Sequence, residues 1–279
     1  MILDGKETSK IVRERIKEVV SKIDEKIKLL VILVGDDPAS QIYVSSKEKA
    51  SKSVGIKPVT WYLDKNITQK ELINKIHEAN NDPSIHGILV QLPLPKHLEE
   101  QIIINEIDPL KDVDGLTYIN QGKLFNNQKT IVPATPLGVM KIFEEYKLDI
   151  TSKNALVIGR SNLVSKPLAM LLLQKNATVT IAHSKTKNLK EIAKTMDIVI
   201  SCVGKPKFIT ADMIKEDAIV IDVGISRYIG RVIGDVAFDE VSLIADAITP
   251  VPGGVGPMTI AALLENVVEC YKLQNAKGK

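Results

Sequence analysis

A strand–helix–strand pattern over residues 155–186 constrains the fold of this chain more than any other feature. The apolar run Ala155–Ile158 ends at Gly159, a polar turn follows, and leucines at helical spacing lead to a second β-branched run that ends near Ala182. This pattern is typical of a βαβ unit. The turn after the first strand of such a unit is where phosphate binds, because exposed amides and the helix dipole favour an anion there.

The turn carries only part of the usual dinucleotide signature. It reads Gly159-x-Ser161-x-x-x-Ser165, where the full signature is G-x-G-x-x-G. On its own, this pattern fits a nucleotide-binding turn and a buried helix–strand joint equally well. The rest of the chain has to distinguish the two.

Composition and charge exclude several classes of protein. Of the 279 residues, 44% are hydrophobic and 25% charged, which suits one large or two ordinary globular domains. The 37 lysines and arginines are interspersed with 34 acids, so we expect no binding to nucleic acid or to a membrane surface. No apolar stretch reaches the roughly 18 residues of a membrane span, and no leader pattern is present. We expect a cytoplasmic protein in which Cys202 and Cys270 are reduced thiols.

The first half of the chain alternates between strand and helix patterns. Apolar runs at 29–34, at 59–63 and from residue 85 are separated by helical patterns that begin near residues 39 and 68. The first run is apolar throughout, as in a strand covered on both faces of a parallel sheet. We therefore predict an α/β layer that ends within 117–135, the least periodic part of the chain.

The second half predicts a doubly wound sheet with its own ligand edge. Apolar runs at 197–203 and 218–224 follow the βαβ unit, and each ends in glycine. Ligands on such sheets lie beyond the carboxyl ends of the strands. Those ends are Gly159, His183–Ser184, Gly204 and Gly224–Ile225.

The residues beyond the second strand of the βαβ unit favour NADP over NAD. NAD-selective enzymes usually place an acid there, about 20 residues past the glycine turn. Here His183 and Ser184 hold that place, and no carboxylate is present to repel a 2′-phosphate. Arg160, in the turn itself, could bind that phosphate; the alternative is that it is a solvated surface cation.

A tyrosine and a lysine share one face of the helix that begins near residue 39. Tyr43 and Lys47 are four residues apart, and the helix starts at the carboxyl end of a buried strand. At a cleft, desolvation would lower the pKa of the lysine toward that of a general base. The alternative is an ordinary stacked surface pair. Gln91, at the end of another strand, could orient the lysine or simply cap a chain turned by Pro93.

Two other stretches have unusual composition. Asp112 and Asp114 flank Val113, but no histidine or third acid lies at ligand spacing, so we expect no metal site. The loop from Pro252 to Pro257 combines three glycines with prolines at both ends. Such a loop permits close approach of a ligand, or makes a tight crossing between domains.

Eight motifs in a fixed order carry a family resemblance. They are 43–47 (YVSSK), 90–95 (VQLPLP), 111–116 (KDVDGL), 133–136 (PATP), 157–161 (VIGRS), 182–186 (AHSKT), 234–236 (GDV) and 252–259 (PGGVGPMT). Together they resemble the bifunctional methylenetetrahydrofolate dehydrogenase/methenyltetrahydrofolate cyclohydrolase family. The resemblance implies an α/β catalytic domain over residues 1–136, completed by a C-terminal helix at 258–279. It also implies an NADP-binding Rossmann domain over 137–257, a folate cleft between the two, and a homodimer.

The resemblance also implies the reaction and the residue roles. Members oxidise 5,10-methylenetetrahydrofolate with NADP and then hydrolyse the methenyl product to 10-formyltetrahydrofolate. The implied catalytic residues are Lys47, Tyr43, Gln91 and Asp114. The implied substrate-binding residues are those four together with Val90, Leu92, Pro252, Gly253, Gly254, Val255 and Gly256. The implied cofactor contacts are Gly159, Arg160, Ser161, Ser184 and Ile225.

Two departures from the family pattern bear on these roles. Ala134 stands where many members have cysteine, which should matter little because that thiol is not an essential catalyst. Ser165 replaces a glycine in the cofactor turn, which could tighten packing near the pyrophosphate. Two alternative functions stay open: a dehydrogenase without cyclohydrolase activity, and a non-catalytic NADP-binding regulator on the same fold.

Overall fold

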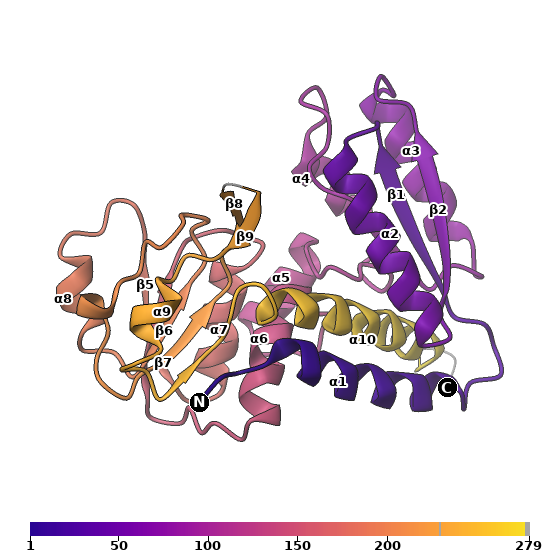
Figure 1. The fold of residues 1–279 in the computed structure, drawn as a ribbon. Coiled ribbons are helices and arrows are strands. Elements are labelled where there is room, and N and C mark those ends of the chain that lie inside the picture. The colour runs from indigo at the N-terminus through magenta and orange to yellow at the C-terminus, as the bar shows by residue number, and fades with distance from the viewer. Residues whose placement is uncertain (229, 277–279) are drawn as a thin grey trace. The chain divides into compact units, whose positions relative to one another are not determined.

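The computed structural model of the chain describes residues 1–228 and 230–276 (Figure 1). It divides into two compact units. Unit 1 comprises Met1–Lys10 and Thr135–Thr259, and unit 2 comprises Ile11–Ala134 together with the chain from Ile260 onward. Each unit contains a parallel sheet. The predicted class, α/β with two domains, is confirmed.

Unit 2 is built on a three-stranded parallel sheet in the order β2-β1-β3. The strands are β1 (Lys28–Val34), β2 (Lys57–Leu63) and β3 (Gly87–Val90). The helices that follow them are α2 (Pro38–Ser53), α3 (Gln69–Asn81), α4 (Glu100–Asn105) and α5 (Tyr118–Phe125). α2 and α3 lie on opposite faces of the sheet (Figure 1). The central strand β1 is therefore covered on both faces, which explains its continuous apolar run.

Two local signals fix where the first helices of unit 2 begin. Asp37 caps α2, since its carboxylate accepts from Ser40 N at 2.8 Å, and Pro38 occupies the first turn. A capping box begins α3: Thr68 Oγ1 accepts from Glu71 N, and the Glu71 carboxylate accepts from Thr68 N. α2 therefore starts directly beyond the carboxyl end of β1.

Unit 1 is built on a five-stranded parallel sheet in the order β10-β7-β6-β4-β5. The strands are β4 (Asn154–Ile158), β5 (Thr178–Ala182), β6 (Ile198–Ser201), β7 (Ile219–Asp222) and β10 (Ala247–Ile248). The helices are α6 (Ala134–Glu145), α7 (Ser165–Gln174), α8 (Leu189–Ala193) and α9 (Phe238–Val241), and β8 (Ser226–Tyr228) pairs with β9 (Arg231–Ile233). The predicted βαβ unit is β4-α7-β5. The strand order reverses between β4 and β6, which makes this the topological switch point.

The first residues of the chain pack with unit 1. Leu3 N donates to Ile248 O at 2.8 Å, and Ile248 N donates to Met1 O at 3.0 Å. Further along, Lys6 N donates to Gly253 O at 2.9 Å. The sequence-based division assigned these residues to the catalytic domain, whereas the contacts place them beside β10. Both long helices, α1 (Gly5–Val20) and α10 (Val255–Ala276), contribute residues to both units.

Several short elements differ from the expectations drawn from periodicity. α5 lies within 117–135, the least periodic part of the chain, and Thr117 caps it by accepting from Asn120 N. Between β6 and β7 the chain forms a single 3-10 turn, Ala211–Met213, which the periodicity of the sequence did not predict. Elements of one or two turns carry too few apolar positions for a period to be recognised.

Candidate active site

A buried glutamine holds the candidate lysine in unit 2. Lys47 Nζ, on α2, donates to Gln91 Oε1 at 3.0 Å. Gln91 follows β3, and its amide nitrogen donates to Leu92 O at 2.7 Å while its backbone N–H donates to Ile32 O. The side-chain amide is thus fixed with its oxygen toward the lysine. This contact joins two residues that are far apart in the sequence and gives Gln91 the means to orient Lys47.

Burial shifts the pKa values of Lys47 and Asp114. It lowers the pKa of the Lys47 ammonium, an effect that the charge of Asp114 partly offsets. It also raises the pKa of the Asp114 carboxyl, which the charge of Lys47 lowers and that of Asp112 raises further. The site therefore contains a lysine that loses its proton more readily than an exposed one. That property suits a group that must act first as a base and then as an acid.

The two aspartates of the 112–114 stretch have different surroundings. Asp112 is buried, and its Oδ2 accepts from Thr117 N and from Asn120 Nδ2, both at 2.9 Å. Asp114 is half-buried and lines a small cavity with Val90 and Leu116. Within the described part of the chain, its carboxylate has no hydrogen-bond partner. Asp112 thus shapes the loop, and Asp114 remains available to a ligand.

The loop that carries Asp114 is fixed from two sides. Gly115 has a φ of +64°, and a Cβ added there would lie 2.7 Å from Ile131 O. Asn266, buried on α10, donates from Nδ2 to Val113 O at 2.8 Å and to Val132 O at 2.7 Å. Sequence reasoning missed Asn266. The available signal was a polar residue within the apolar pattern of a buried helix.

Replacing Asn266 with leucine should destabilise the protein. The substitution removes the Asn266 donor from the buried Val113 carbonyl and from the partly buried Val132 carbonyl, at about 1–3 kcal/mol for a fully buried unsatisfied group and less for a partly buried one. We expect the free energy of unfolding in urea to fall by about 2–4 kcal/mol on this basis. Asn275→Leu on the same helix is the matched control, because Asn275 is exposed and donates only to Tyr271 O of its own helix. Equal stability of the two variants would contradict the role given to Asn266.

The other predicted substrate residues of unit 2 surround the same helix and strand. Tyr43 lies one helical turn before Lys47 on α2, and its ring is exposed. Val90 is buried at the end of β3, and Leu92 is half-buried. The structure therefore brings Val90, Gln91, Lys47 and Asp114 together. The ring of Tyr43 is exposed, so a ligand can contact it.

The predicted glycine loop, Pro252–Gly256, lies within unit 1. Gly253 has a φ of +110°, and a Cβ added to Gly254 would lie 2.5 Å from Pro250 O. The N-terminal segment also approaches closely, since a Cβ added to Gly5 would lie 1.8 Å from Gly254 O. Close backbone packing accounts for the glycine at 254, and conformation accounts for the glycine at 253.

The predicted cofactor turn lies at the carboxyl end of β4. Gly159 has a φ of +142°, and an added Cβ would lie 2.4 Å from Ser165 Oγ and 3.1 Å from Cys202 O. Ser161 Oγ accepts from Val164 N at 3.1 Å and from Ser165 N at 3.2 Å. The amides of Val164 and Ser165, at the start of α7, therefore donate to the protein's own hydroxyl. Ser165 is fully buried, and its Oγ lies against Gly159.

The remaining predicted cofactor residues are exposed at the same edge. Ile158 of β4 pairs with Ala182 of β5. Arg160 comes two residues after Ile158, and Ser184 comes two residues after Ala182. Both are exposed, as is Ile225 beyond β7. No carboxylate follows β5 directly, so this edge can accept a 2′-phosphate.

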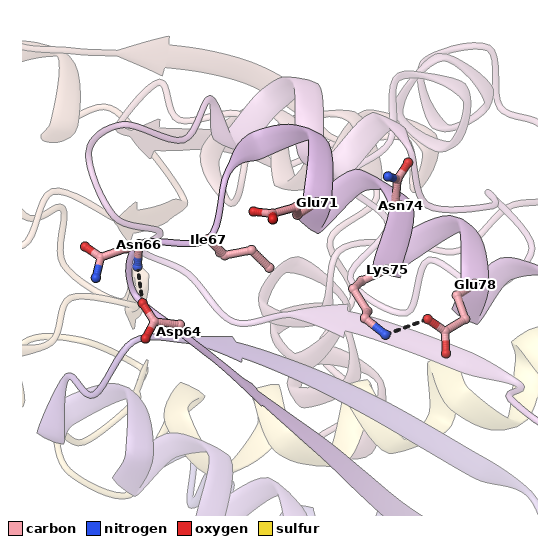
Figure 2. A pocket seen from close by; sticks show the side chains of 7 residues that line it. All are labelled: Asp64, Asn66, Ile67, Glu71, Asn74, Lys75 and Glu78. Carbon is pink, nitrogen blue, oxygen red and sulfur yellow. Dashed lines mark hydrogen bonds and ion pairs between the residues drawn. The ribbon is translucent and has the colours of Figure 1, made fainter.

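A cavity of about 730 Å³ lies elsewhere in unit 2, at the carboxyl end of β2 and along α3 (Figure 2). Its lining side chains are Asp64, Asn66, Ile67, Glu71, Asn74, Lys75 and Glu78. They are largely engaged with one another or with nearby backbone: Asp64 accepts from Asn66 N, Lys75 pairs with Glu78, and Glu71 belongs to the capping box. None of the predicted site residues lines this cavity.

The described residues offer neither a metal site nor a membrane span. No group of three or more His, Cys, Asp or Glu side chains among them could hold a metal ion. No helix among them is both long enough and apolar enough to cross a membrane.

Comparison with known proteins gives full-length matches. The family model described as "Tetrahydrofolate dehydrogenase/cyclohydrolase, catalytic domain" matches residues 3–114, and the model of the NAD(P)-binding domain of the same family matches residues 133–275. The bifunctional protein FolD of Campylobacter concisus is 53% identical over 99% of each chain. That of Acetivibrio thermocellus is 50% identical over 98% of this chain and 97% of its own.

Solved structures agree with these matches. The FolD methylenetetrahydrofolate dehydrogenase/cyclohydrolase of Campylobacter jejuni superimposes with a TM-score of 0.96 at 47% identity, covering 98% of this chain and 99% of the other. The Trypanosoma brucei methylenetetrahydrofolate dehydrogenase-cyclohydrolase, solved with NADP and an inhibitor, has a TM-score of 0.93 at 34% identity and covers 98% of each chain.

Proposed function

This chain belongs to the tetrahydrofolate dehydrogenase/cyclohydrolase family, and from that membership we propose a bifunctional enzyme. It oxidises 5,10-methylenetetrahydrofolate to the 5,10-methenyl compound with NADP, and then hydrolyses that product to 10-formyltetrahydrofolate. The observation that carries the proposal is the bond from Lys47 Nζ to Gln91 Oε1, beside the half-buried Asp114. A module that only bound nucleotide would have no use for this arrangement.

Unit 1 contributes cofactor binding and orientation to the oxidation. When bound, NADP accepts a hydride at C4 of its nicotinamide, so the reaction needs proximity and orientation more than acid–base help. The residues at the carboxyl edge fit this cofactor. Gly159 allows close backbone approach, while Arg160 and Ser184 are exposed where a 2′-phosphate would lie.

Unit 2 contributes the proton transfers of the hydrolysis. Water attacks the amidinium carbon of the methenyl cation, and neutral Lys47 accepts a proton from it. As the bond from this carbon to N5 breaks, Lys47 returns the proton to N5, the water oxygen becomes the formyl oxygen, and the second water proton leaves to solvent. Gln91 holds the lysine in place, and Asp114 provides a carboxylate for the pterin ring and a negative charge beside the cation.

The test follows absorbance at the nicotinamide and methenyl bands. Methylenetetrahydrofolate is supplied with NADP or with NAD, and hydrolysis of methenyltetrahydrofolate is followed separately without nucleotide. We expect both reactions, with NADP preferred. Oxidation without hydrolysis would indicate the monofunctional alternative, and NADP binding without either reaction would indicate a regulator.

The proposal extends to assembly and location. By family resemblance, the working form is a homodimer in the cytoplasm, acting on tetrahydrofolate one-carbon derivatives. The balance of 37 basic against 34 acidic residues supports the absence of nucleic acid among its partners. Sedimentation equilibrium would measure the assembly directly, and a monomer at micromolar concentration would contradict this part.

A further inference from the structure

Two aspartates in unit 1 are buried, and the proposed reaction does not use them. The exposed fractions of Asp222 and Asp235 are 3% and 0%. No lysine, arginine or histidine side chain that the structure describes forms an ion pair with either. A buried carboxylate without a cation is costly unless hydrogen bonds satisfy it, so these two require an explanation.

Asp235 binds the loop that follows β6. Its Oδ2 accepts from Ser201 Oγ at 2.9 Å, from Val203 N at 2.8 Å and from Gly204 N at 3.2 Å, and its Oδ1 accepts from Lys205 N at 2.7 Å. Three successive backbone N–H groups that converge on one carboxylate resemble the concave sites that bind anions. Here the protein's own side chain is the anion, and it fixes the conformation of the loop.

Asp222, the last residue of β7, in turn holds Asp235. Its Oδ1 accepts from Gly224 N and from Asp235 N, and its Oδ2 accepts from Val236 N, all at 2.9 Å. Burial, with a contribution from the charge of Asp235, raises the pKa of Asp222 to about 6. The chain of contacts therefore runs from β7 through Asp235 to the loop after β6.

Two glycines leave room for this pair of carboxylates. A Cβ added to Gly224 would lie 2.1 Å from Asp235 Oδ1, and one added to Gly234 would lie 1.9 Å from Asp222 Oδ2. Any larger residue at either position would displace a carboxylate. Glycine at positions 224 and 234 therefore leaves the space that the carboxylates of Asp222 and Asp235 occupy.

The loop held by Asp235 adjoins the predicted cofactor turn. A Cβ added to Gly159 would contact Cys202 O at 3.1 Å and Cys202 Cβ at 3.3 Å, so the two backbones are in close contact. In doubly wound sheets the first strand binds the pyrophosphate and the second binds the adenosine ribose. Here these strands are β4 and β5, so the nicotinamide half of a bound NADP would extend toward β6 and β7.

We propose that Asp235, supported by Asp222, is a positioning residue for the nicotinamide half of NADP. It fixes residues 202–205 against the Gly159 turn, and this loop sets the surface on which the nicotinamide half lies. The inference rests on the proposed function, since it requires NADP as the cofactor.

The test compares binding of NADP with binding of 2′-phospho-ADP-ribose, which lacks the nicotinamide. Asp235→Asn keeps the shape of the side chain but replaces one acceptor oxygen with a donor. We expect affinity for NADP to fall about tenfold, as for loss of hydrogen bonds to a charged group, and affinity for the fragment to stay within about twofold. The KM for NADP should rise, while nucleotide-free hydrolysis of methenyltetrahydrofolate should not change. Equal losses for NADP and the fragment, or no loss of NADP affinity, would overturn the inference.

Two further variants keep the test decisive. Asp197→Asn is the matched control, because Asp197 accepts from Asn154 N at 2.9 Å at the amino end of the same sheet; it should leave NADP binding unchanged. If Asp235→Asn does not fold, Ser201→Ala removes one donor to Asp235, and a selective loss of about threefold for NADP is expected. Unchanged NADP affinity in Ser201→Ala would then refute the inference. A wild-type enzyme that binds NADP but catalyses neither reaction would contradict the proposed function and leave this binding comparison valid.

Discussion

Lys47→Met is expected to abolish cyclohydrolase activity, with a loss of roughly a hundredfold to ten-thousandfold, as for removal of a general acid–base group. Methionine matches the length of the lysine stem but can neither accept nor return a proton. Without Lys47, water has no base beside the methenyl carbon, and N5 has no proton donor as the ring opens. The measurement is the rate of methenyltetrahydrofolate hydrolysis without nucleotide.

The same variant should keep its fold and its binding of NADP. Lys47 is only half-buried, and its bond to Gln91 is the one that the substitution removes. Lys49→Met is the matched control, since Lys49 is exposed on the same helix and should keep full hydrolysis. Hydrolysis at the wild-type rate by Lys47→Met would end the assignment of Lys47 as the base.

The pH dependence of hydrolysis gives an independent check on Lys47. Burial lowers the pKa of Lys47, and only the neutral amine can accept a proton. Activity should therefore fall as the pH drops below this lowered pKa, and it should reach a plateau above it. In Lys47→Met, the residual rate should lose this dependence.

The sheets could be predicted from the sequence because both are parallel and covered on their two faces. Residues 29–34 of β1 and residues 198–200 of β6 read as unbroken apolar runs, which are typical of strands buried on both faces. β10, in contrast, has two residues, and it pairs with the N-terminal segment through the bridge between Ile2 and Ile248. Because Ile2 and Ile248 are far apart in the sequence, their pairing produces no local sequence pattern from which it could be predicted.

The candidate site was predictable only in its residue types. Spacing placed Tyr43 and Lys47 on one helix face, but it could not show that Gln91 lies 3.0 Å from the lysine, since this contact joins α2 to the end of β3. Asn266 and Asp235 act through backbone carbonyls and amides; Asp235 lies in the 234–236 motif, but neither residue's backbone partners can be identified from the sequence. Their one signal is a polar residue where the surrounding pattern demands burial, and such a residue needs a partner.

Arg160→Ala is expected to weaken NADP by about ten- to a hundredfold, the effect of losing charge-assisted bonds worth about 1.5–3 kcal/mol. NAD should be affected less than about twofold, because it lacks the 2′-phosphate on which the arginine acts. The structure sharpens this expectation. Ser161 Oγ already accepts from the first amides of α7, so the turn offers fewer free donors to a phosphate, and the exposed side chains of Arg160 and Ser184 carry more of the recognition.

The measurement is the dissociation constant of each nucleotide, taken at low and at high salt. Selective loss of NADP should shrink at high salt, because salt screens the exposed arginine. Lys175→Ala is the control: this exposed lysine lies at the opposite end of α7, where no phosphate is expected, so both affinities should persist. Equal losses for NADP and NAD in Arg160→Ala would place the arginine on the shared pyrophosphate, and would refute the 2′-phosphate assignment on which the preference for NADP depends.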